Sequence, residues 1–279
     1  MPVIINLAYE PTATPPVAQQ NDIQYACTQW EIALTARGHN LTINVEVWAT
    51  DMGATGLNGM CIPGIMQTPN STLTRPQAKA NAILAPNDPA IDLIIAIDST
   101  TAWILGTPPV VPLGPGNYSL STTFMHELCH GLGFLGLCNV DTTVVPSVGI
   151  YTDANLLLIL NATVALMNPV IIIPPHFFPI VPVSGFAVIT PFANLFHYVP
   201  PALNKGVAAD DFTAFTTAND IVINTLHANY TILTGAPFQP FTTCDHITGA
   251  NYLMNPTTMG QYYAAPDASS LNILGLIGW

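Results

Sequence analysis

The first 135 residues alternate between two hydrophobic periodicities, and this alternation restricts the fold more than any other feature of the chain. Apolar residues alternate or run continuously, as they do in strands, over residues 3–9, 41–49 and 91–98. Helical spacing covers residues 17–37 and 75–84, and the apolar face of the first is formed by Ile23, Ala26, Trp30 and Leu34. Strands interleaved with helices are typical of an α/β or α+β fold.

A third helix is predicted where the sequence reads STTFMHELCHGLGF. Residues 121–123 offer an N-cap, and the glycines of residues 131–133 offer a stop. His126 and His130 are four residues apart, so they lie on one face of the predicted helix and both imidazoles can converge on one ion. Neutral imidazole suits zinc. Glu127 lies beside such an ion, where a carboxylate takes a proton from water and passes it to a leaving amine.

Two histidines do not complete a catalytic zinc site, which normally has three protein ligands and one open position. The remaining histidines are His39, His176, His197, His227 and His246. We interpret His39 as an ordinary polar residue, and spacing alone does not choose among the other four. The pattern at residues 126–130 also has a plain alternative, a helix whose histidines are incidental.

The segment HELCHGLGF resembles the start of the zinc motif of the metzincin metallopeptidases, in which the helix ends at a glycine matching Gly133. Most metzincins carry the third histidine where this chain has Gly136. The chain is similar instead to the leishmanolysin branch and its bacterial secreted relatives, where a long insertion precedes that histidine and a turn of sequence LMxP follows it. By this resemblance, the segment FTTCDHITGANYLMNP implies His246 as the third ligand and Met254 with Pro256 as the methionine turn.

The same resemblance implies a two-lobed, metzincin-like α/β (α+β) fold that forms one catalytic domain. Residues 1–133 would form an upper lobe, with a twisted mixed sheet and the zinc helix. Residues 134–279 would form an irregular, Pro-rich lower lobe with the third ligand, the methionine turn and a terminal helix capped by Asp267. The predicted core-facing side chains of that helix are Leu271, Leu274 and Ile277. The expected cofactor is one Zn²⁺ per chain, and the expected substrate is an extended polypeptide that adds a strand to a sheet edge.

Other polar residues near these motifs have less defined roles. Some metzincins carry an oxyanion-stabilising tyrosine two residues after the methionine, and this chain has none there. Tyr262 and Tyr263 lie further on and are candidates for that role. Asp245 is a candidate hydrogen-bond acceptor behind the metal.

The cysteines do not form a metal motif of their own. They are Cys27, Cys61, Cys129, Cys138 and Cys244. The odd count leaves at least one unpaired, and one or two disulfides are compatible with it. Cys129 inside the predicted helix is expected to be a buried thiol. Cys244 is expected to be a disulfide partner or a buried thiol, although it lies close enough to His246 to reach a metal.

Charge and hydropathy exclude some classes of partner. The chain contains four basic and 16 acidic residues, which give a formal net charge of −12. Four basic residues are too few to form a basic patch that binds nucleic acid. The most apolar stretch, residues 156–189, is interrupted by five prolines, so no membrane-spanning helix is predicted. The N-terminus shows no signal peptide pattern. The compartment stays open, with a secreted or particle-associated protein favoured over a cytosolic one, and the oligomeric state is not indicated.

These observations predict a zinc-dependent endopeptidase with Glu127 as its general base. Two alternatives remain. The first is a catalytically silent structural or adhesive protein on the same scaffold, which the low charge and the Pro-, Thr- and Asn-rich loops would suit. Glu127 argues against it, because a structural zinc site has no use for that carboxylate. The second is a zinc hydrolase that does not cleave peptides, since the HExxH pattern does not name the substrate bond.

Overall fold

The computed structural model describes part of the chain. The described residues are 2–53, 57–68, 71–109, 113, 116–134, 138–141, 148–151, 164–166, 221–224, 229–231, 246–249, 251–256 and 261–279. The chain divides into two compact units. Unit 1 comprises Met1–Met66, Thr74–Gly133 and Gly249–Trp279, and unit 2 comprises Gln67–Leu73 and Phe134–Thr248.

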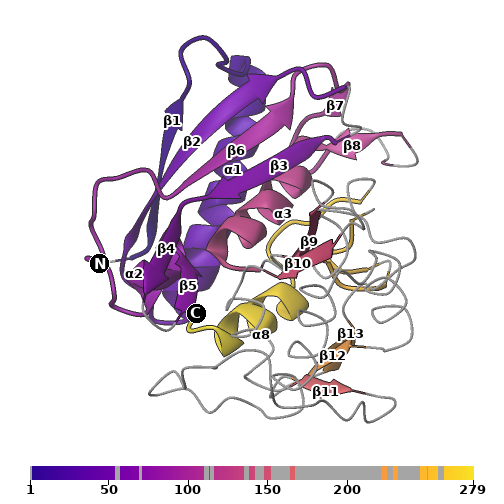
Figure 1. The fold of residues 1–279 in the computed structure, drawn as a ribbon. Helices are drawn as coiled ribbons and strands as arrows, with labels where there is room; N and C mark the ends of the chain where they lie inside the picture. Colours follow the sequence, from indigo (N-terminus) through magenta and orange to yellow (C-terminus); the bar gives the residue numbers. More distant parts are fainter. Residues whose placement is uncertain are drawn as a thin grey trace. The chain divides into compact units, whose positions relative to one another are not determined.

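Unit 1 is built on a four-stranded mixed sheet (Figure 1). In spatial order its strands are β1 (Ile4–Tyr9), β2 (Thr42–Thr50), β6 (Leu93–Asp98) and β3 (Gly59–Pro63). The first three are parallel, and β3 runs antiparallel to β6 with Cys61 opposite Ile95. Strand β3 therefore forms an edge of the sheet next to a buried parallel strand.

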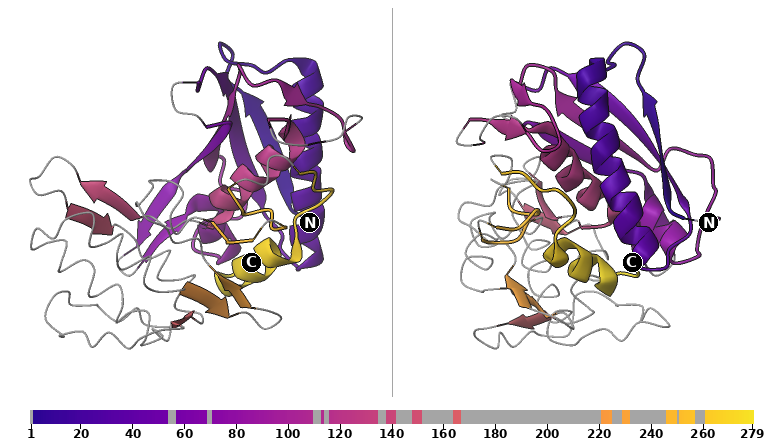
Figure 2. Two further views of the ribbon diagram at one scale, coloured as in Figure 1. Left: turned by 90° about the vertical axis from the view of Figure 1, so that its right-hand side faces the viewer. Right: turned by 180° about the vertical axis from the view of Figure 1, so that it is seen from behind.

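Two helices, α1 (Val17–Ala36) and α3 (Leu120–Leu132), lie side by side on the same face of this sheet (Figures 1 and 2). Alternate residues of β2 point into the layer between sheet and helices and are buried, among them Val45. The indole of Trp30 is fully buried, and its Nε1–H donates to the Met125 carbonyl oxygen at 3.0 Å. This bond ties the two helices together at the level of the predicted metal ligands.

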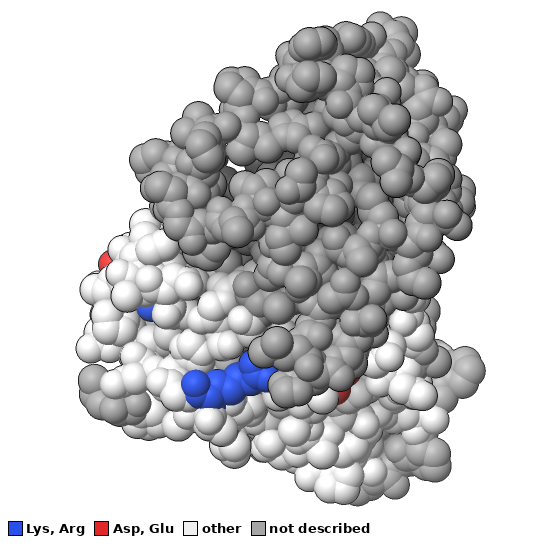
Figure 3. All heavy atoms as spheres, turned by 90° about the horizontal axis from the view of Figure 1, so that it is seen from below, with Lys and Arg blue, Asp and Glu red and all other residues white. Residues whose placement is uncertain are grey.

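The short helix α2 (Arg75–Ala80) carries half of the basic residues of the chain into an ionic cluster. The side chain of Lys79 is fully buried, and its Nζ lies 2.6 Å from Asp92 Oδ2. The same ammonium donates to the carbonyl oxygens of Thr42 and Asp88 at 2.8 and 3.0 Å. Arg75 pairs with Asp88 and also lies 3.4 Å from Asp92. The described part of the face in Figure 3 shows few charged side chains.

The terminal helix α8 (Ala268–Leu276) belongs to unit 1, together with the sheet. Trp279 Nε1–H donates to the Leu132 carbonyl oxygen at 2.8 Å, and Gln77 Nε2 donates to that of Ile277 at 3.3 Å. The end of α8 is buried against unit 1, with Ile273, Leu274 and Ile277 among the buried side chains. The division into two lobes at residue 133 stays a prediction.

The remaining strands are short. In unit 1, β7 (Trp103–Ile104) pairs in parallel with β8 (Tyr118–Ser119). A two-stranded sheet joins β4 (Ile65–Thr68) to β5 (Ser71–Thr74). Unit 2 contains two further antiparallel groups: β9 (Cys138–Asp141) with β10 (Val148–Tyr151), and β12 (Ile221–Asn224) between β11 (Val164–Leu166) and β13 (Asn229–Thr231).

The mixed α/β character expected from the sequence is confirmed, and the differences lie in the details of single elements. Helix α3 starts at an N-cap, Ser119, that lies two residues before the expected cap. Helix α2 ends at Ala80 rather than at residue 84. In α8, Ile273 is buried where Leu271 was expected, and Leu271 is only half-buried. Among the described residues, no helix is both long and apolar enough to cross a membrane.

Candidate metal centre

Helix α3 positions His126, Glu127 and His130, and each of its residues is buried. The helix starts where Ser119 Oγ accepts a hydrogen bond from Thr122 N at 3.3 Å. It ends at Gly133, whose φ of 123° lies in the region that favours glycine. A Cβ at Gly133 would lie 2.7 Å from Ile277 Cδ1, so a larger residue there would also displace the end of the Ile277 side chain.

The two α3 histidines face each other across one helical turn. Their Nε2 atoms are 3.1 Å apart, and the rings meet edge to face with centroids separated by 4.8 Å. His126 Nδ1 lies 2.6 Å from the Leu253 carbonyl oxygen. Because a carbonyl oxygen only accepts, the proton of the neutral ring must be on Nδ1. His126 Nε2 then carries a lone pair, which is the form of the nitrogen that a metal ion binds.

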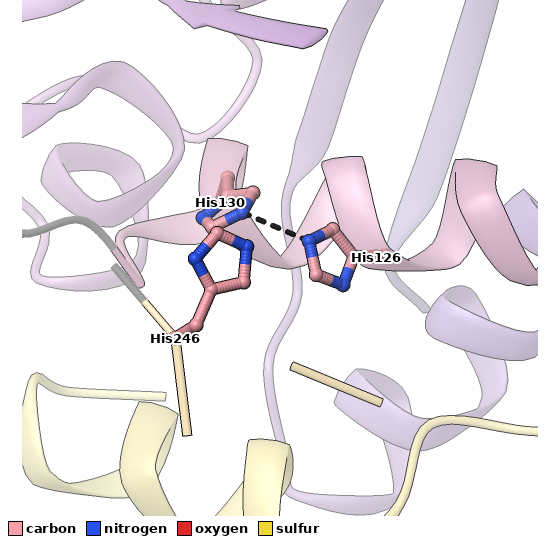
Figure 4. A group of neighbouring side chains, drawn as sticks. All are labelled: His126, His130 and His246. Carbon is pink, nitrogen blue, oxygen red and sulfur yellow. Dashed lines mark hydrogen bonds between the residues drawn. The ribbon is translucent and has the colours of Figure 1, made fainter. Parts of the chain in front are cut away.

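His246 joins these two histidines (Figure 4). One ring nitrogen of each of the three lies within 4.8 Å of the others, and all three residues are buried. Three nitrogens bound tetrahedrally at about 2.0–2.1 Å would lie roughly 3.3 Å apart, so small shifts bring the group to this geometry. Three imidazoles are also a donor set suited to a transition metal. The residues therefore fit a metal ion of this class.

Burial keeps His126 in the state that a metal ion requires. Desolvation lowers the pKa of His126 to about 4, an effect partly opposed by its hydrogen bond to Leu253 and by the charge of Asp267. The imidazole is thus neutral at pH 7, and no proton has to be removed before a cation binds.

Glu127 is held against the edge strand β3. Its carboxylate accepts a hydrogen bond from the backbone N–H of Cys61. Burial raises the pKa of Glu127 to about 8, and the Cys61 bond opposes this rise. A Cβ at Gly59 would lie 3.1 Å from both Cγ and Oε1 of Glu127. The strand approaches the carboxylate this closely because residue 59 has no side chain.

The expected methionine turn lies beneath His126 and supports it through a backbone atom. Leu253 and Met254 are fully buried, and Pro256 is half-buried. Leu253 supplies the carbonyl oxygen that His126 contacts, while its N–H donates to Asp267 Oδ2 at 2.9 Å. Sequence reasoning assigned Asp267 only to the cap of α8. A helix cap uses one carboxylate oxygen of an aspartate, so the second oxygen of Asp267 was the feature that could have indicated a further contact.

The other predicted residues are distributed as follows. The hydroxyls of Tyr262 and Tyr25 lie 3.1 Å apart, and the Tyr263 hydroxyl donates to Gln261 Oε1 at 3.2 Å. Neither contact tests the oxyanion role, which stays a prediction. His39 packs edge to face against Trp279, with ring centroids 5.3 Å apart. The predictions for His176, His197, His227, Cys244 and Asp245 fall outside the described residues.

Within the described part of the chain, Cys27, Cys61 and Cys129 carry free thiols. Cys27 and Cys129 are buried, as expected for Cys129, and desolvation raises the pKa of both thiols. Two disulfides are therefore excluded, and a single bond between Cys138 and Cys244 is the pairing that remains to be tested.

Comparison with protein-family models, with curated proteins and with solved structures gives no significant match for this chain.

Proposed function

We propose that the chain is a zinc-dependent endopeptidase. In this proposal His126, His130 and His246 bind one zinc ion, and Glu127 is the general base. The observation that carries it is the position of Glu127, a buried carboxylate next in sequence to one of three buried, converging histidines. A purely structural site has no use for such a group, whereas a hydrolytic site gains a general base from a carboxylate beside the metal.

Zinc held by three imidazoles supplies a Lewis acid that polarises a carbonyl group and makes water more acidic. The protein's own groups orient the ligands and transfer the proton. The Leu253 carbonyl oxygen keeps the proton of His126 on Nδ1 and fixes the orientation of the ring. Glu127 takes a proton from the attacking water and delivers it to the nitrogen of the leaving amine.

Two features of Glu127 suit this exchange of protons. A pKa near 8 without a cation means that the carboxyl group readily holds a proton, and a neighbouring cation favours the ionised form that accepts one. The Cys61 N–H directs the carboxylate while it changes state. The β3 edge beside it suits an extended polypeptide, which would pair with the strand through backbone hydrogen bonds.

The test combines zinc content with casein cleavage, measured with and without a chelator. We expect about one zinc per chain and cleavage that the chelator abolishes and added zinc restores. Zinc without casein cleavage would favour the structural protein or a hydrolase of another bond, and hydrolysis of ester substrates would separate these two. A chain that binds no zinc, or cleavage that survives the chelator, would contradict the proposal.

The ligand set has a separate test. His246→Ala should weaken zinc binding strongly, because two imidazoles remain of three. His197→Ala and His227→Ala are the matched controls and should bind zinc as the unmodified chain does. Zinc affinity is measured by competition with a coloured chelator. If one of the two controls loses zinc while His246→Ala keeps it, the third ligand is misassigned.

A further inference from the structure

We infer that Asp267, the N-cap of the terminal helix, is a positioning residue for the metal ligand His126. The inference rests on the proposed function, since it concerns the same metal centre, and it assigns a role there to a residue far from the HExxH motif. The carboxylate of Asp267 uses its two oxygens for two different tasks.

The first oxygen holds the helix. Asp267 Oδ1 accepts a hydrogen bond from Ser270 N at 2.9 Å, which is the usual bond of an N-cap aspartate. A capping role alone would be complete with this contact.

The second oxygen holds the turn beneath the metal centre. Asp267 Oδ2 accepts from Leu253 N at 2.9 Å and from Ser269 Oγ at 2.6 Å. Residues 251–256 contain no helix or strand, so regular backbone pairing does not fix their position. A hydrogen bond from a backbone N–H to an ionised carboxylate is among the stronger ones, and it ties Leu253 to the start of a packed helix.

Leu253 in turn restrains the side chain of His126. Its carbonyl oxygen lies 2.6 Å from His126 Nδ1 and decides which ring nitrogen carries the proton. If the Leu253 backbone shifted away, the ring could rotate or carry its proton on Nε2, the atom that faces His130. A neutral imidazole protonated on Nε2 cannot bind a metal ion through that atom. Residues that orient a ligand in this way typically change metal affinity by about 10–100-fold when they are replaced.

The decisive variant is Asp267→Ser. Serine caps helices about as well as aspartate, but its side chain is too short to bond Ser270 N and Leu253 N together. We expect the zinc affinity of Asp267→Ser to fall by about 10–100-fold. Ser269→Ala is the matched control, because it removes one bond to Oδ2 and leaves the Leu253 bond in place. Its zinc affinity should match that of the unmodified chain.

A second control separates positioning from general loss of stability. Thr74→Ala removes the hydroxyl that caps α2 in the same unit and makes no change at the turn. It should lower the thermal unfolding temperature and leave zinc affinity unchanged. Thermal unfolding of the metal-free variants is measured alongside affinity for all three.

A third readout does not depend on zinc. Nitrogen-15 NMR of the metal-free chain distinguishes a histidine protonated on Nδ1 from one protonated on Nε2. We expect His126 to be protonated on Nδ1 in the unmodified chain, and the Nε2–H form to appear in Asp267→Ser. If the tautomer and the zinc affinity of Asp267→Ser are both unchanged, the inference is overturned. If the unmodified chain binds no zinc, the proposed function fails, and the NMR comparison still decides the role of Asp267.

Discussion

Single residues outside α3 determine the orientation of the His126 and Glu127 side chains on that helix. His126 is oriented by a backbone carbonyl of the turn, and Glu127 is oriented by a backbone N–H of β3. Both contacts use the backbone, so the side chains of Leu253 and Cys61 can vary without removing them. What matters at these positions is where the backbone runs.

Replacing Glu127 by Gln tests the proton transfer. Gln has nearly the same shape but cannot take a proton from water, so kcat on casein should fall by about 10²–10⁴-fold. Zinc content should stay near one per chain, because the proposed ligands are the three histidines. Steady-state kinetics and metal analysis of the same preparation provide the check. Cleavage at the unmodified rate would eliminate Glu127 as the base.

Replacing Gly59 by Ala tests the position of the same carboxylate. The added methyl group would lie 3.1 Å from Glu127 Oε1 and 3.0 Å from Thr123 Cγ2, closer than ordinary contact. We expect the carboxylate to move by a few tenths of an ångström and kcat to fall several-fold, with KM less affected and zinc retained. Gly53→Ala is the control, because that glycine is exposed and its nearest neighbour is the side chain of Asp51 at 3.2 Å. Equal kcat values for the two variants would show that β3 does not restrain Glu127.

At the level of elements, local periodicity predicted those with a long apolar pattern. Helix α1 and strands β1, β2 and β6 lie where the sequence places them, because their burial follows the pattern of their own residues. Strand β3 was not predicted. It is short, begins with Gly59 and ends with Pro63, and depends on pairing with β6, at least 30 positions further along the chain. Such an edge strand has no distinctive sequence signal of its own.

The residues of the candidate site also differ in whether the sequence alone predicts them. The spacing of His126 and His130 follows from helix geometry, so sequence alone identifies them. His246 came from a family resemblance and not from spacing, and the three-histidine group is what the structure adds. The bond between Asp267 and Leu253 joins residues in different local structures, and no periodicity predicts it.

Helix α2 offers a test of stability at the element scale. Lys79→Met would leave the carboxylate of Asp92, whose side chain is fully buried, without its closest cation. Arg75, at 3.4 Å, would compensate only in part. Removing one partner of a buried ion pair typically costs about 3–5 kcal/mol in the free energy of unfolding. Denaturant unfolding of the metal-free chain measures the change.

The double variant Lys79→Met with Asp92→Asn is its control. The new amide side chain would carry no charge and could still accept the hydrogen bond that Asn44 N now donates to Asp92 at 2.8 Å. We expect the double variant to recover much of the lost stability. A single variant as stable as the unmodified chain would mean that water or Arg75 neutralises the buried carboxylate.

At the scale of the whole molecule, acidic residues far outnumber basic ones. The chain has four basic residues, and two of them, Arg75 and Lys79, are engaged in the ionic cluster with Asp88 and Asp92. The rest of the sequence contains two basic residues, Arg37 and Lys205, and 14 acidic ones (16 less Asp88 and Asp92). The excess negative charge makes repulsion between copies of the chain the expected long-range interaction at neutral pH.

The burial of Lys79 also determines how the chain responds to trypsin, which cleaves after lysine and arginine. Arg75 precedes Pro76, a bond that trypsin does not cut, and the Lys79 side chain is fully enclosed. The folded helix α2 therefore offers trypsin no site. Once the helix opens, the bond after Lys79 becomes cleavable, and the fragment that starts at Ala80 reports that opening. The ionic cluster thus gives the protein an intrinsic reporter of its own unfolding, which mass spectrometry can read without a label.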